Sequence, residues 1–147
     1  MVVSDRYAVV AFVSKSKADP GTIEVWELGT DSHATIRCVD AGSECHDMAI
    51  LGTTLAVACG CGHVHMYDLA QLATGEIIKQ RSMAWPPEPE GWSDSFDYDV
   101  TAAVSLALSE TWVAGIINYT ATVRVWSRET GEVCCIYSAI SSPRIAT

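Results

Sequence analysis

The sequence lacks any apolar run of the length that a membrane-spanning helix needs, which is about 20 residues. Its one apolar stretch near the start is broken by Asp5 and Arg6, so it does not match the pattern of a secretion signal. These two absences argue against a membrane protein built on helices. We expect an intracellular protein, in the cytoplasm or the nucleus.

Basic residues are also scarce. Nine lysines and arginines stand against 18 acidic residues, which gives a net charge of −9. The average field of such a chain repels a phosphate backbone. The composition therefore argues against nucleic acid as a partner and is compatible with a basic protein or peptide.

Motifs of the common enzyme classes are missing as well, among them a phosphate-binding loop, a dinucleotide fingerprint and a nucleophile elbow. Cys45, His46 and Asp47 are the residue types of a catalytic triad, but catalysis needs proximity in space, which adjacency in the sequence does not supply. Six cysteines without a secretion signal are expected to be thiols. We predict a non-enzyme with no cofactor and no metal.

What the sequence does contain is a repeat. Three segments share one register: residues 22–27 (TIEVWE), 63–68 (HVHMYD) and 122–127 (TVRVWS). Apolar and polar residues alternate in each, and an aromatic residue stands next to last. Because successive side chains of a strand point to opposite faces, this pattern predicts three copies of one β-strand.

The residues before these strands match too. Residues 3–10, 51–58 and 108–115 each place a polar turn before an apolar strand. Thr-Gly-Glu follows the aromatic residue at 74–76 and at 130–132, and glycine there suits a tight hairpin. Residues 100–117 are apolar enough for a buried helix, but their alignment with the other copies favours strands.

The histidines and cysteines of the second copy alternate in the manner of soft-metal ligands: Cys59, Cys61, His63 and His65. The other copies have Glu24 and Arg124 at the position of His65. A hairpin is also expected between Cys61 and His63. We therefore interpret these residues as positions of the repeat and not as a metal site.

A period near 40 with a Trp-Asp-like pair at the end of one strand resembles the WD-repeat family of β-propellers. The pairs here are Trp26-Glu27, Tyr67-Asp68 and Trp126-Ser127, and the Gly-His pair that often opens a family repeat is absent. The resemblance implies an all-β fold of about three four-stranded antiparallel blades. Only the packing roles of Trp26, Tyr67 and Trp126 between stacked blades carry over.

The expected divisions of this single domain are blade 1 at about 1–41, blade 2 at about 46–80, an insertion at 81–99, blade 3 at about 100–138 and the start of another blade at 139–147. Closed propellers typically have four to eight blades, so three form an open arc with an apolar face at each end. We expect either part of a larger propeller or a protomer that a second copy completes, giving about six blades.

The insertion is the candidate binding site. Its prolines forbid a central strand, and its aromatic side chains stand among acidic ones, a pattern typical of binding hot spots. The predicted partner-binding residues are Trp85, Pro86, Pro87, Glu88, Trp92, Asp94, Phe96 and Tyr98. A mobile acidic loop that folds back on the propeller is the other interpretation of the same residues.

Two functions from different classes follow. The first is a non-catalytic scaffold that binds a protein or peptide partner, including a basic one, through the rim of the propeller. The second is a propeller that binds or converts a small ligand with polar loops at its central channel. The repeat, the acidic charge and the insertion favour the scaffold.

If the insertion carries the binding site, deletion of residues 81–99 should abolish partner capture and leave thermal stability nearly unchanged. A pull-down and a thermal melt of the deleted chain measure both quantities. If the deleted chain still captures its partner, the assignment of the binding site to the rim of the propeller is wrong.

Overall fold

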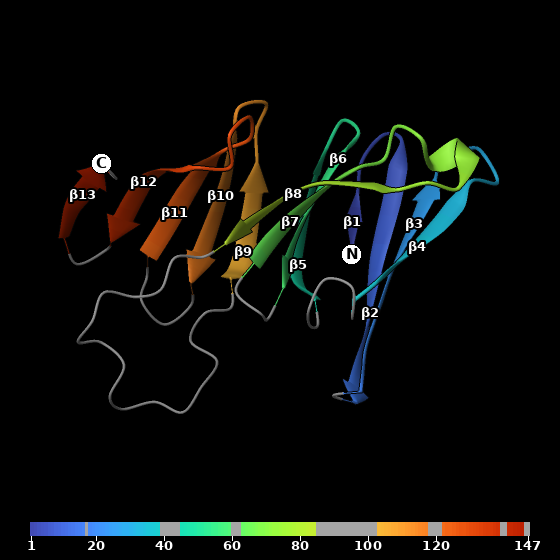
Figure 1. Cartoon of the computed structure of the whole chain (residues 1–147). Coiled ribbons are helices and arrows are strands. Elements are labelled where there is room, and N and C mark those ends of the chain that lie inside the picture. Colours follow the sequence, from blue (N-terminus) through green and yellow to red (C-terminus); the bar gives the residue numbers. More distant parts are fainter. Residues whose placement is uncertain are drawn as a thin grey trace.

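The computed structural model describes residues 1–16, 18–38, 45–59, 63–84, 103–117, 122–138 and 141–145. These residues form an all-β structure of three antiparallel sheets that lie side by side in chain order (Figure 1). The fold class expected from the sequence is confirmed at this level. None of the described residues belong to a helix that is long and apolar enough to span a membrane.

Each sheet is a meander in which neighbours in the chain pair with one another. The first sheet contains β1 (Val2–Val3), β2 (Tyr7–Ser16), β3 (Asp19–Glu27) and β4 (His33–Arg37). The second contains β5 (Cys45–Leu51), β6 (Thr54–Cys59), β7 (His63–Asp68) and β8 (Ile78–Ala84), with a short 3-10 turn, η1 (Leu72–Thr74), before β8. The third contains β9 (Ala103–Leu108), β10 (Trp112–Ile117), β11 (Thr122–Ser127), β12 (Val133–Ser138) and β13 (Ser141–Ile145).

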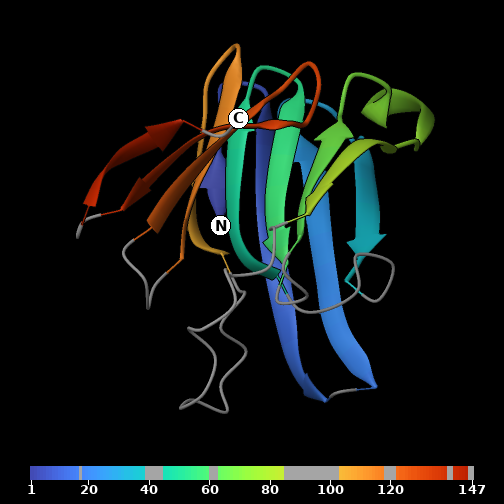
Figure 2. The same cartoon turned by 60° about the vertical axis from the view of Figure 1, so that its left-hand side comes forward.

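The first strands of the three sheets are neighbours in space. β5 contacts β1 on one side and β9 on the other, so the second sheet lies between the other two. Figure 2, a turned view, shows the same order of sheets. The sheets stack face to face, and their first strands lie next to one another. This arrangement is consistent with propeller-like blades.

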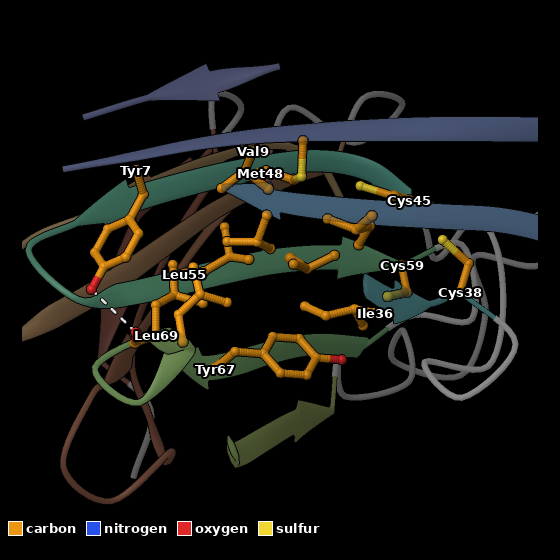
Figure 3. Close-up of a cluster of buried hydrophobic side chains, with 14 residues drawn as sticks. Tyr7, Val9, Ile36, Cys38, Cys45, Met48, Leu55, Cys59, Tyr67 and Leu69 are labelled. Atoms are coloured by element: carbon orange, nitrogen blue, oxygen red, sulfur yellow. Dashed lines mark hydrogen bonds between the residues drawn. The ribbon is translucent and has the colours of Figure 1, made fainter. Parts of the chain in front are cut away.

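Two apolar cores hold the sheets together. Tyr7, Val9 and Ile23 of the first sheet pack with Leu55 and Val57 of the second (Figure 3). A second cluster joins the opposite face of the second sheet to the third, and it contains Ala56, Ala58, Val64, Met66, Met83, Val113 and Trp126. Alternate residues of β6 therefore enter different cores, and all six of its residues are buried. This explains why residues 55–59 of β6 form a continuous apolar run.

Two divisions of the chain differ from those expected. β8 extends to Ala84, because its pairing follows β7 as far as His63 and because Met83 is buried in the second core. Deletion of residues 81–99 would therefore remove part of a core strand, and the segment to delete is 85–99.

The final strand, β13, does not begin a new sheet but pairs with β12, where it gains the hydrogen bonds of an open edge. Pro143 is compatible with such an edge position.

Polar contacts near the turns also join the sheets. The Tyr7 hydroxyl donates to the Leu69 carbonyl at 3.1 Å, and an Nη of Arg128 donates to Thr54 Oγ1 at 2.7 Å. At the first strands, the Asp47 carboxylate accepts the backbone N–H of Leu106 at 2.6 Å. Arg81 of β8 donates to two carbonyls in the turn before β12, those of Glu129 and Thr130.

Because of the contact with Arg81, we expect a Gly→Ala substitution to cost more stability at Gly131 than at Gly29, although the two glycines have similar backbone conformations. Gly29 has φ +79° and no atom within 4 Å of the place that a Cβ would take, whereas at Gly131, with φ +75°, a Cβ would lie 2.7 Å from Arg81 Cδ. Gly29→Ala should cost about 1 kcal/mol for the left-handed backbone alone. Gly131→Ala should cost about 1 kcal/mol more, because Arg81 must leave its carbonyls.

Urea denaturation of the two variants measures this difference. Arg81→Ala serves as the control, because in that background the two glycine substitutions should cost the same. If Gly29→Ala and Gly131→Ala lose equal free energies of unfolding in the parent chain, the Arg81 contact does not stabilise the fold.

Candidate functional site

The residues predicted to bind a partner lie outside the part of the chain that the structure describes. They are Trp85, Pro86, Pro87, Glu88, Trp92, Asp94, Phe96 and Tyr98. Their role stays a prediction. The described residues offer other surfaces, namely two outer sheet faces and a groove.

The three repeat aromatics occupy one position in their sheets but have different surroundings. Tyr67 lies in the core between the first and second sheets with 5% of its surface exposed, and Trp126, between the second and third, is 0% exposed. Trp26 is 36% exposed. This exposure differs from the packing between blades that we expected for Trp26, because no described segment covers its side of the first sheet.

Two outer sheet faces are defined by the strand register. Residues directly opposite each other in neighbouring strands point to the same face. The face that carries Trp26, here named the first-sheet open face, contains Val3, Ala8, Val10, Phe12, Glu24 and Trp26. The third-sheet open face, on the side of that sheet away from Trp126, contains Trp112, Ala114, Ile116, Val123, Val125 and Tyr137.

Glu24 is the charged group at the centre of a small polar cluster on the first-sheet open face. Its carboxylate accepts a hydrogen bond from Thr35 Oγ1 at 2.7 Å and lies 2.6 Å from His33 Nε2. Burial acts to raise the pKa of this carboxyl, but the hydrogen bonds of Thr35, Thr22 and His33 outweigh that effect and lower the pKa below its ordinary value. Glu24 is therefore ionised at neutral pH.

The alternating histidines are packing residues in the structure. His65 is buried, its ring stacks on that of His63 with centroids 5.9 Å apart, and its Nδ1 lies 2.6 Å from Ser82 Oγ. Cys61 lies outside the described residues. Within the described ranges no three His, Cys, Asp or Glu side chains are grouped so that they could hold a metal ion.

The Cys45, His46 and Asp47 segment has a structural use. The Asp47 carboxylate holds the backbone N–H of Leu106 in β9. Burial, with smaller contributions from Cys38 and Asp47, raises the pKa of the Cys45 thiol to about 12. Figure 3 shows Cys45 with Cys38 and Cys59 at one end of the first core. A buried thiol with this pKa is a poor nucleophile.

A groove of about 580 Å³ lies between the outermost strands of the first and second sheets. One side is formed by β4, residue by residue from His33 to Arg37, and the other by residues 75–79, together with Tyr67. A sheet face presents only alternate residues of a strand. Since five consecutive residues border the groove on each side, it runs along the edge of β4 and along the start of β8.

The groove combines an apolar base with charged surroundings. Ile36 and Tyr67 are buried, and Ile77 packs against the same core. Arg37, Glu76 and Lys79 supply charge of both signs along its length. Leu72 of η1, which is buried, anchors the loop that leads to this side of the groove.

No sequence signal indicated this groove. Its two sides are far apart in the chain, and neither contains an unusual residue pattern. The groove exists because the first and second sheets stack while their last strands stay apart. A scan against protein-family models and a search of curated proteins found no match for this chain.

The high pKa of Cys45 predicts low reactivity of this thiol in the folded protein. Iodoacetamide should alkylate Cys134, which is only partly buried, well before Cys45, because the thiolate is the reactive form. Peptide mass spectrometry of a time course measures both rates. In denaturant the two thiols should react alike, and equal rates in the native protein would contradict the burial of Cys45.

Proposed function

We propose that this chain is a non-catalytic interaction module of the β-propeller kind, which binds an extended segment of a partner protein in the groove between β4 and β8. The observation that carries the proposal is that the groove is bordered by strand edges. β4 and β8 are both terminal strands of their sheets. An edge strand presents backbone N–H and C=O groups that another extended chain can pair with.

The dimensions suit a short segment. The five residues of β4 that border the groove extend about 17 Å at about 3.3 Å per residue. A strand added here would place alternate side chains toward Ile36, Ile77 and Tyr67. Alternate apolar residues in the partner segment would therefore be buried, while Arg37, Glu76 and Lys79 select the charges between them.

The predicted role of the insertion is compatible with this site but independent of it. Its aromatic and acidic residues would add a second contact, as the sequence pattern suggests. Deletion of residues 85–99, which leaves β8 complete, separates the two contributions.

The test compares two isoleucines of similar exposure. Ile78, 44% exposed, lines the groove, and Ile116, 42% exposed, lies on the third-sheet open face. A linear peptide library displayed on phage is selected against the chain, and the affinity of the selected peptides is measured by calorimetry. Ile78→Glu should weaken binding about tenfold or more, since a buried isoleucine contributes about 1.5–3 kcal/mol. Ile116→Glu should leave the affinity unchanged.

Amide chemical shifts locate the peptide directly. Residues 33–37 and 75–79 should show the largest changes on binding. Selection of no peptide, equal affinity of both variants, or shifts confined to other residues would overturn the proposed site.

A further inference from the structure

The three sheets use equivalent positions on their two sides, and the register makes the equivalence explicit. One side of each sheet is turned toward the sheet before it in the chain, and the equivalent residues on that side are Trp26, Tyr67 and Trp126. Each of them lies opposite the second residue of the strand before it, which is Ala8, Leu55 and Val113 in turn. On the side that faces the following sheet, the matching sets are Val9, Ala56 and Ala114; Ile23, Val64 and Val123; and Val25, Met66 and Val125.

Burial at these positions depends on whether a neighbouring sheet is present. Tyr67 and Trp126 are buried, whereas Trp26 is exposed. In the same way Val25 and Met66 are buried, whereas Val125, their counterpart in the third sheet, is only partly buried. The residue types stay apolar where the neighbour is missing, so both open faces keep the composition of an interface.

Among the residues that the structure describes, most of the exposed large apolar side chains lie on these two faces. On the first sheet they are Val3, Phe12 and Trp26, and on the third they are Trp112, Ile116 and Tyr137. Leu28 adds to the first group, since its counterpart Leu69 is fully buried against the first sheet. Exposed apolar side chains gathered on one sheet face are typical of a contact surface.

We propose that a second copy of this chain covers these faces, with the first-sheet open face of each copy packed on the third-sheet open face of the other. The reason is complementarity within one chain. The two internal interfaces each join a face of the Trp26 type to a face of the Val25 type. One copy exposes one face of each type, so a second copy offers the correct partner for both.

The polar group on the first-sheet open face is compatible with burial there. Glu24 occupies the position of His65 and Arg124, and both of these are buried between sheets. The position therefore accepts a polar side chain that has hydrogen-bond partners, as Glu24 has in Thr35 and His33. Because the two faces differ, the contact is head to tail, and two such contacts close a pair of copies into a ring of six sheets.

The mass in solution is the first test. Sedimentation velocity across a dilution series should show a species of twice the 15.8 kDa chain mass. Trp26→Glu and Ile116→Glu each place a charge in one of the two faces, and each variant alone should be a monomer. Phe12→Glu repeats the first-face test at a more exposed position, in case Trp26→Glu lowers the melting temperature.

Mixing the two variants tests the head-to-tail geometry. Trp26→Glu keeps an intact third-sheet face and Ile116→Glu keeps an intact first-sheet face, so the mixture should form a hetero-pair through one remaining contact. If like faces made contact instead, one of the two variants would still form a pair when alone. Mixing the variants would then produce no pairing beyond what each shows by itself. Ile78→Glu, which lies on neither face, should associate like the parent chain.

Three results would overturn the proposal. They are a parent chain that stays monomeric at every concentration, a series of growing oligomers without a closed pair, and pairing that survives both face variants. The peptide-binding test on Ile78 is unaffected by any of them, so the two proposals can fail separately.

Discussion

A β-sheet with apolar side chains on both sides needs a layer on each side to remove them from water, and this need governs how the three sheets are arranged. The second sheet satisfies it within the chain, since β6 is buried along its full length by the first sheet on one side and the third on the other. Burial of this kind supplies about 25 cal/mol for each Å² of apolar surface removed from water. The outer sheets meet this need on one side each, and the second copy proposed above would cover the other side.

Several polar side chains in this fold join neighbouring sheets. Tyr7, Asp47, Arg81 and Arg128 each bind a backbone or hydroxyl group of a neighbouring sheet near a turn or a first strand. These bonds fix how one sheet sits against the next, which apolar packing alone leaves adjustable. They also account for Asp47, whose place beside Cys45 and His46 resembles a catalytic arrangement in the sequence but serves to hold β9.

Edges and faces of the sheets carry different chemistry. The groove between β4 and β8 offers backbone groups of terminal strands, which suit an extended peptide. The two open faces offer side chains only, which suit another sheet. The two surfaces meet at β4, because His33, Thr35 and Arg37 line the groove and also lie on the first-sheet open face. The other side of the groove, residues 75–79, belongs to neither open face.

The alternation of residues 22–27, 63–68 and 122–127 is a local property, so the sequence by itself determined the strands, the threefold repeat and the all-β class. It could also place an aromatic residue at one position of each copy. Only the tertiary structure decided that Trp126 is buried and Trp26 is not, because burial depends on whether another sheet covers that side. The groove and the pairing of β13 with β12 likewise depend on where strand edges lie relative to one another, and no residue pattern within a single segment encodes that distance.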